Sequence, residues 1–267
     1  MIRRGWFPVL LGAALAITLA FLVLPVVAVF TNVPPGQLLS SLADPASTAA
    51  LKLSLETTLI ALVVIVVVGT PVAYLLGTRS FRGKAVIVTL IELPLVMPPA
   101  VAGLALLAAL GPDGILGGVL GDAGVHLVFA TAGVVVALVF VSAPFYIRQA
   151  QASFQAVDPR LFDASRTLGS GEAATFVRVV APVALPGLVA GLALAWGRAL
   201  GEFGATLMFA GSLTGITQTA PLAIYDQFSS NFPGALALGA VLVAISAALL
   251  LAVKLIPGAD SLGRAPR

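Results

Sequence analysis

The sequence predicts an all-α integral membrane protein with six transmembrane helices. Of its 267 residues, 60% are hydrophobic and only 9% are charged, and the mean hydropathy is +1.11. Because a soluble domain needs a charged surface, this composition excludes an ordinary soluble protein. Apolar runs long enough to cross a bilayer recur six times, and none shows the alternating pattern of a membrane β-barrel. The spans are therefore predicted to be helices, in which each segment satisfies its own backbone hydrogen bonds.

The six predicted spans cover residues 6–30, 53–77, 85–110, 127–147, 183–209 and 234–256. Arg3 and Arg4, ahead of the first span, also resemble the start of a secretory signal peptide. The apolar core of a signal peptide is about 7–15 residues long, and this run is longer, so we interpret it as an uncleaved span. The loops at 31–52, 111–126 and 211–233 are rich in Gly, Pro, Asn and Asp, which predicts turns and short surface helices on the outer side.

Positive charge follows membrane topology and does not gather in a patch. The net charge is +3, but the basic residues are not interleaved with aromatics, which argues against a nucleic-acid partner. The basic residues on one predicted side of the membrane are Arg3, Arg4, Arg79, Arg82, Lys84, Arg148, Arg160, Arg166, Arg178, Lys254, Arg264 and Arg267. Lys52 and Arg198 fall elsewhere. By the positive-inside rule, both termini and the polar segment 148–182 are expected to be cytoplasmic.

Residues 148–182 form the longest soluble-looking stretch of the chain. Asp158, followed by proline, has the pattern of a helix N-cap with proline at the first helical position, and Gly169 supplies a left-handed stop. Ser170 is expected to cap a second short helix, which Pro182 ends. The first helix would place on one face Leu161, Ala164, Ser165 and Leu168. Two short helices on one side of the membrane would form a projection that a soluble partner could grip.

Within this segment, Asp163-Ala164-Ser165 is followed after three residues by Gly169 and after nine more by Val179-Val180-Ala181-Pro182. This pattern resembles the "EAA" loop of permease subunits in binding-protein-dependent ABC importers, which has Glu-Ala-Ala, three residues, Gly, nine residues and Ile-x-Leu-Pro. The matching residues are Ala164, Gly169 and Pro182, and the departures are Asp163, Ser165, Val179 and Ala181. The plain alternative is a generic cytoplasmic loop.

Two further stretches narrow the resemblance. Residues 198–211 and 93–99 are similar to the molybdate permease subunits of the molybdate/sulfate group. The resemblance covers roughly residues 53–254 of a single predicted domain, 1–267, and it implies the type I importer fold. The implied cargo is a tetrahedral oxyanion, either molybdate or tungstate, with sulfate or thiosulfate as the alternatives.

The resemblance also implies that the loop carries a coupling helix, which sits in a groove of a separate ATPase subunit. The residues implicated in coupling are Asp158, Asp163, Ala164, Ser165, Leu168, Gly169 and Pro182. The implied partners are a cytoplasmic dimer of ATPase subunits, an external oxyanion-binding protein, a second copy of this chain and the lipid of the cytoplasmic (inner) membrane. ATP and Mg²⁺ would be held by the ATPase, so no cofactor is expected in this chain.

Arg198 and Glu202 are ionisable residues near the middle of the fifth predicted span, where an unpaired arginine costs about 2.5–3.5 kcal/mol on insertion scales. Their spacing puts them on one helix face, so one interpretation is a mutual salt bridge that fixes the helix in its bundle. The other is that they line the translocation path, where Arg198 contacts a passing anion and Glu202 keeps that contact weak. Glu92 in the third span is a weaker candidate of the same kind.

Prolines and glycines mark the third and fifth spans. The predicted kink and packing residues are Pro94, Pro98, Pro99, Gly103, Pro186 and Gly191. The prolines predict a kinked or broken third span, and the glycines permit close helix approach. Residues 94–106 and 182–194 share two prolines and six consecutive identical residues at a constant offset. The repeat indicates either functional equivalence of the two spans or coincidence.

The chain lacks the G-x-x-x-x-G-K-[ST] phosphate loop, so we expect no enzyme activity here and ATP hydrolysis in another chain. With no cysteine and one histidine, His126, a metal site is not expected. The competing functional class is a stand-alone carrier driven by an ion gradient. Such carriers usually have repeated halves and a midplane ion site, whereas the internal repeat relates only two spans.

Overall fold

The computed structural model describes residues 6–34, 36, 40 and 43–255. Every regular element in these residues is helical. Some residues of the predicted termini and last span lie outside the described residues. They are Arg3, Arg4, Ile256, Arg264 and Arg267.

Five helices are long and apolar enough to cross a membrane. They are α1 (Trp6–Thr31), α3 (Pro45–Thr78), α7 (Thr131–Gln155), the continuous segment Glu172–Leu200, and α13 (Phe232–Lys254). The pair α4 (Lys84–Val96) and α5 (Pro99–Leu110) supplies the remaining segment as two helices bent by 118°. The chain is thus a multi-pass membrane protein, and its helices agree with the six predicted spans when the bent pair counts as one.

The second and fourth spans extend beyond the predicted limits at one end. α3 starts at Pro45, not at residue 53, because Asp44 caps it by accepting a hydrogen bond from the Ser47 N–H at 2.9 Å. Lys52 therefore lies inside α3, 3.7 Å from Glu56, with both side chains exposed. α7 continues past residue 147 to Gln155, since the polar residues there are good helix formers.

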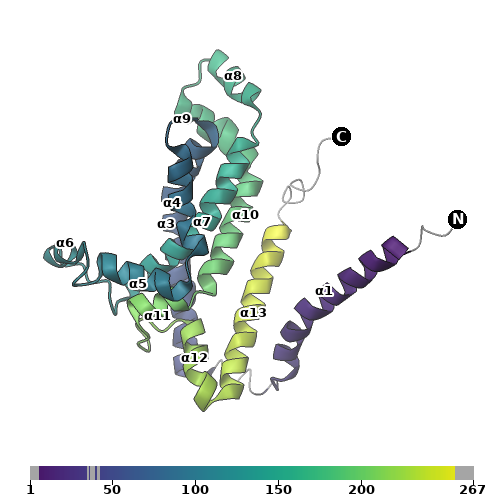
Figure 1. The fold of residues 1–267 in the computed structure, drawn as a ribbon, viewed down its shortest axis with the longest axis vertical. Helices are drawn as coiled ribbons and strands as arrows, with labels where there is room; N and C mark the ends of the chain where they lie inside the picture. The colour runs from purple at the N-terminus through teal and green to yellow at the C-terminus, as the bar shows by residue number, and fades with distance from the viewer. Residues whose placement is uncertain (1–5, 35, 37–39, 41–42, 256–267) are drawn as a thin grey trace.

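The core of the bundle is made by α3, α7 and α10 (Ala181–Leu200), which lie side by side in Figure 1. Ile65, Tyr146 and Phe154 are almost completely buried there. The hydroxyl of Tyr146 lies 2.6 Å from that of Thr70, so the phenol is satisfied inside the packed interface. α1 stands apart from this bundle, near α13, and has no buried residue.

The helices arrange the loops at two ends. α8 (Pro159–Thr167), α9 (Glu172–Thr175) and the turn between α3 and α4 lie toward one end in Figure 1, with the start of α1 and the end of α13 pointing the same way. α12 (Ala220–Ser230) lies at the other end. The predicted short surface helices of the outer loops are present as α6 (Gly117–Asp122) and α12. Which end faces the cytoplasm stays a prediction from charge.

The prediction of one continuous fifth span, 183–209, is wrong. α10 ends at Leu200, and α11 (Gly204–Ala210) begins after a break of three residues. α5 and α11 each follow the break in a span. They pack against each other and form one unit beside the bundle. This unit packs on α7 as well, through Ala205 and Phe209 against Ala137 and Val141.

Candidate coupling helix and intramembrane charge pairs

α8 has the start and stop signals that the sequence predicted. Asp158 precedes it, and its Oδ1 accepts a hydrogen bond from the Arg160 N–H at 2.9 Å. Gly169 follows it with φ +82°. The N–H groups of Gly169 and Ser170 donate to the carbonyls of Arg166 and Ser165 at 2.9 and 3.1 Å. These two bonds are the Schellman pattern, which satisfies the last carbonyls of a helix.

The predicted common face of α8 is divided between two environments. Ala164 and Leu168 of this face are exposed, and Leu168 retains 86% of its accessible surface. Asp163, which lies outside the face, is exposed too. Ser165 is buried instead, and its hydroxyl lies 2.9 Å from the hydroxyl of Thr175. This bond joins α8 to α9 at the position where Ser165 departs from the family pattern. α8 thus offers an outward surface to a partner while its inner side is fastened to the next helix.

The expected second short helix, capped by Ser170 and ended by Pro182, is also wrong. Gly171 precedes the short α9, which runs into the π-helical segment Phe176–Val180 and then into α10 without a break. Pro182 lies in the first turn of α10. Inside an α-helix, Pro182 would lack an N–H to donate, and its ring would clash with the carbonyl four residues earlier. The wider π turn just before Pro182 coincides with the place where that clash would arise. The coupling region is therefore mechanically continuous with a membrane-crossing helix.

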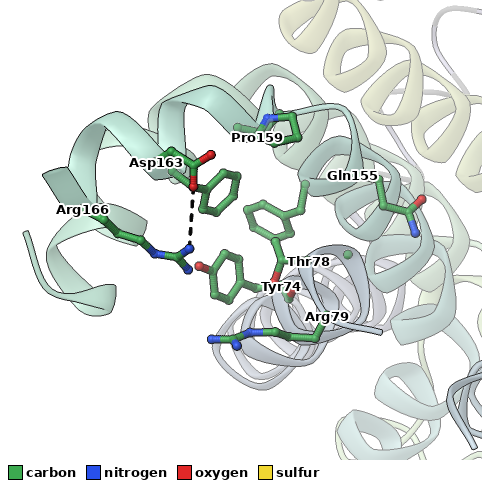
Figure 2. A pocket seen from close by; sticks show the side chains of 11 residues that line it. Tyr74, Thr78, Arg79, Gln155, Pro159, Asp163 and Arg166 are labelled. Atoms are coloured by element: carbon green, nitrogen blue, oxygen red, sulfur yellow. Dashed lines mark hydrogen bonds and ion pairs between the residues drawn. The ribbon is translucent and has the colours of Figure 1, made fainter. Parts of the chain in front are cut away.

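A pocket of about 380 Å³ lies behind α8. Figure 2 shows Asp163 and Arg166 of α8 facing Tyr74, Thr78 and Arg79 at the end of α3. The Arg166 Nη1 and Asp163 Oδ1 atoms are 4.0 Å apart, while Arg79 pairs with Glu172 of α9 at 2.5 Å. The end of α3 is thereby tied to the α8–α9 unit by charge as well as by packing.

Arg198 and Glu202 form the predicted ion pair but not on one helix. The Arg198 Nη1 and Glu202 Oε2 atoms are 2.5 Å apart, with Arg198 in the last turn of α10 and Glu202 in the break before α11. Glu202 Oε1 accepts the Ala205 N–H at 2.6 Å, so it satisfies one of the free N–H groups at the start of α11. Glu202 is only 2% exposed. The carboxylate therefore connects two helices while both of its oxygens are bound.

Glu92 has a partner that sequence analysis missed. Its Oε1 lies 2.6 Å from the Nε of Arg148, which joins α4 to α7. The sequence predicts Arg148 in a loop because the apolar run stops before it. The helix-forming residues that follow Arg148 were the signal that α7 continues and that this arginine belongs to the bundle.

The third span is broken at two of its three prolines. Pro94 lies inside α4, whereas Pro98 and Pro99 take the N-cap and first positions of α5, at the 118° bend. Pro186, in contrast, lies inside the uninterrupted α10. The two segments of the internal repeat, 94–106 and 182–194, therefore have different helix geometries.

Gly103 and Gly191 lie at close helix contacts. A Cβ at Gly103 would be 2.6 Å from the Met208 Cβ and 2.7 Å from the Ala205 carbonyl oxygen, across the α5–α11 contact. A Cβ at Gly191 would be 3.1 Å from the Gln149 Cβ, across the contact of α10 with α7. The described residues hold no group of three or more His, Asp or Glu that could bind a metal ion.

Comparisons with known proteins agree with this arrangement. The chain is 36% identical over 244 residues to the "Probable transport system permease protein NifC" of Clostridium pasteurianum, covering 91% of this chain and 85% of the relative. It is 39% identical over 235 residues to the "Molybdenum transport system permease protein ModB" of Mycobacterium bovis, covering 88% and 89%.

Solved structures share the fold at low sequence identity. A bacterial ABC transporter involved in the import of the acidic polysaccharide alginate superposes with a TM-score of 0.78 at 16% identity, covering 98% of both chains. The alginate transporter in complex with its pentasaccharide-bound periplasmic protein gives 0.74 at 15%, covering 94% of both. The profile of the "Binding-protein-dependent transport system inner membrane component" family matches residues 69–258. This chain therefore belongs to that family of transport permeases, which is not a class of enzymes.

Proposed function

We propose that this chain is the membrane-spanning subunit of an ATP-driven importer that moves molybdate, or tungstate, from an external binding protein into the cytoplasm. Two copies would enclose one path in the cytoplasmic membrane, and a dimer of separate ATPase subunits would supply the energy. The observation that carries the proposal is 39% identity over 88% of the chain to a relative named as a molybdenum transport permease. The absence of a phosphate loop from the sequence fits a division of labour in which ATP is bound elsewhere.

The geometry of α8 supports the coupling role. Its exposed Ala164 and Leu168 would sit in the ATPase groove. On the inner side, the Ser165–Thr175 bond and the Arg79–Glu172 pair transmit a displacement of α8 to α9 and α3. Because α9 continues into α10, closure of the ATPase dimer on ATP would tilt a membrane-crossing helix. The two bundles would then rock to open toward the binding protein, as alternating access requires.

The same displacement would reach Arg198, at the far end of α10. Its side chain is 28% exposed, so part of the guanidinium can meet an anion while the rest holds Glu202. The nearby carboxylate keeps that contact weak, and a path must bind its cargo weakly enough to release it. Selectivity between oxyanions would therefore belong to the binding protein.

Reconstitution tests this function directly. Proteoliposomes that hold the chain, its ATPase and the binding protein should take up radiolabelled molybdate only when ATP is present on the side of the membrane where the ATPase lies. The purified chain alone should give none. Uptake by the chain alone under a proton or sodium gradient would overturn the proposal in favour of an ion-gradient carrier. Uptake in which sulfate or thiosulfate outcompetes molybdate would retain the importer and reassign its cargo.

Arg198→Gln tests the role of the charge pair in the same assay. A hydrogen bond to a charged group contributes about 1.5–3 kcal/mol, so we expect uptake to slow by about tenfold or more. The order of preference among molybdate, tungstate and sulfate should stay the same. A changed order would show that the permease itself selects its cargo.

A further inference from the structure

A second pocket, of about 370 Å³, opens between α4, α7 and α10. Its lining residues are Leu95 of α4, Leu194 of α10, and Pro144, Phe145, Arg148, Gln149 and Ala152 of α7. The walls are mostly apolar, and the polar groups among them are the guanidinium of Arg148 and the amide of Gln149. A single positive group in an apolar pocket is an arrangement that favours an anion.

The guanidinium of Arg148 has donors to spare. Its Nε binds Glu92 Oε1 at 2.6 Å, and its Nη1 donates to Gln151 Oε1 at 3.4 Å. Arginine carries five N–H donors in a planar fork. Within the described part of the chain, the remaining N–H groups of Arg148 have no acceptor. The side chain is 46% exposed. Arg148 can therefore hold an oxyanion without giving up its bond to Glu92.

The Glu92–Arg148 pair lies well inside the helices that cross the membrane. Glu92 comes eight residues after Lys84, the first residue of α4, which places it about 12 Å from that helix end at 1.5 Å per residue. Arg148 lies seven residues before Gln155, the last residue of α7, a distance of about 10 Å. Because exposure of a charge to lipid is costly, we expect these two partly exposed side chains to face protein or water. The pocket is thus expected to open onto a water-filled path.

Two close contacts fix the register of α7 and α10. A Cβ at Gly187 would meet Ser153, and a Cβ at Gly191 would meet Gln149. Residue numbers rise on one helix as they fall on the other, so the two helices are antiparallel. Arg148, next to Gln149, is therefore level with the turn of α10 that holds Gly191.

Arg198 lies seven residues beyond Gly191 on α10, about 10 Å farther along the bundle. Leu194, one turn before Arg198, forms part of the pocket wall. The bundle thus holds two arginines at successive levels, each paired with a glutamate: Arg198 with Glu202, and Arg148 with Glu92.

We propose that Arg148 binds the transported anion, and that the pocket between α4, α7 and α10 is a tetrahedral-oxyanion site on the cytoplasmic side of Arg198. This proposal rests on the proposed importer function. The oxyanion passes from Arg198 to Arg148 and then leaves on the α8 side. Glu92 holds the guanidinium in place and weakens its attraction for the anion. Two weak sites in series allow conduction where one tight site would trap the cargo.

Cysteine labelling tests the site without relying on transport. The chain has no cysteine, so Ala152→Cys gives a single thiol in the exposed wall of the pocket. The labelling is done on the complete complex in proteoliposomes with two methanethiosulfonate reagents, the anionic sulfonatoethyl and the cationic trimethylammonium-ethyl compound. The ratio of the anionic to the cationic labelling rate should be about tenfold higher than at an uncharged site. Molybdate should slow the labelling. Arg148→Gln in this background should abolish both the charge preference and the protection, whereas Arg148→Lys should retain the preference.

Val67→Cys is the matched control, because Val67 is 65% exposed on the apolar α3 and is expected to face lipid. If Ala152→Cys reacts no faster than Val67→Cys, the pocket does not open to water and the proposal fails. A charge preference that persists in Arg148→Gln would also overturn it. Glu92→Gln separates binding from mere packing: it should strengthen protection by molybdate, whereas a purely structural ion pair predicts that Glu92→Gln and Arg148→Gln behave alike.

Failure of the site and failure of the proposed function give different results. If Arg148→Gln complexes take up molybdate at the normal rate, and molybdate does not protect Ala152→Cys when Arg148 is present, the site is wrong and the importer stands. If sulfate, and not molybdate, protects Ala152→Cys and is taken up, the site stands and the proposed cargo is wrong.

Discussion

Gly169→Val isolates the coupling region from the rest of the fold. Gly169 has φ +82°, and a Cβ there would meet nothing within 4 Å, so valine would cause backbone strain without a clash. The left-handed conformation costs an ordinary residue about 1–2 kcal/mol. If the chain escapes that strain by changing conformation, it loses the two capping hydrogen bonds of Gly169 and Ser170, each worth about 0.5–1.5 kcal/mol.

The expected penalty is thus about 2 kcal/mol, confined to the connection between α8 and α9. At 1.4 kcal/mol for each factor of ten, this shifts the local equilibrium away from the native orientation of α8 by about 30-fold. The membrane-crossing helices keep their contacts, so the protein should still fold and insert. The measurement is molybdate uptake and ATP hydrolysis by the same proteoliposomes. We expect uptake per ATP hydrolysed to fall steeply.

Two glycines provide matched controls for this substitution. Gly171 has φ −69° and open space around its Cβ position, so Gly171→Val makes the same chemical change in the same loop without left-handed strain. Gly124 has φ +71°, also with open space, but lies in the loop after α6, so Gly124→Val applies the strain far from α8. Both variants should remain coupled. Full coupling in Gly169→Val, or equal uncoupling in Gly171→Val, would refute the reasoning.

Three further results are expected. Ser165→Ala removes the buried bond to Thr175 and should lower stability by about 1 kcal/mol, measured by thermal unfolding in detergent and accompanied by weaker coupling. Gly103→Val should destabilise by about 1–3 kcal/mol through overpacking against α11, whereas Gly197→Val, with open space around it, should cost less in the same measurement. Hydrogen bonds from the Ser47 side chain and backbone lower the pKa of Asp44. The cap should therefore stabilise α3 above about pH 4 and lose its effect as pH falls through the folded-state pKa. In Asp44→Asn, the stability measured by thermal unfolding should no longer change with pH over that range.

Hydropathy and local start and stop signals predicted most of the fold. Six apolar runs gave the membrane segments because lipid leaves the backbone few alternatives to a helix. Asp158 and Gly169 marked α8 because capping depends on residues next to each other in sequence. Pro98 and Pro99 marked the break between α4 and α5 for the same reason.

The features that sequence analysis missed depend on contacts between distant residues. The bond of Ser165 to Thr175 and the pair of Glu92 with Arg148 join separate helices, and no local pattern reports them. The sequence predicts a helix end at Pro182, whereas the helix continues through this proline after the π turn at Phe176–Val180. The break after Leu200 contains no proline, and a glycine such as Gly201 is tolerated inside many helices, so the sequence did not locate the break.

That break explains how a carboxylate can be buried in this fold. On one continuous helix, Glu202 could have paired with Arg198, but a buried ion pair often adds little stability because desolvation offsets the attraction. With the helix broken, one Glu202 oxygen binds Arg198 and the other binds the Ala205 N–H of α11. The helix N-terminus adds favourable positive potential. The charge is therefore held by the end of one helix and the start of the next, so the direction in which α11 leaves α10 and the position of the arginine are set together.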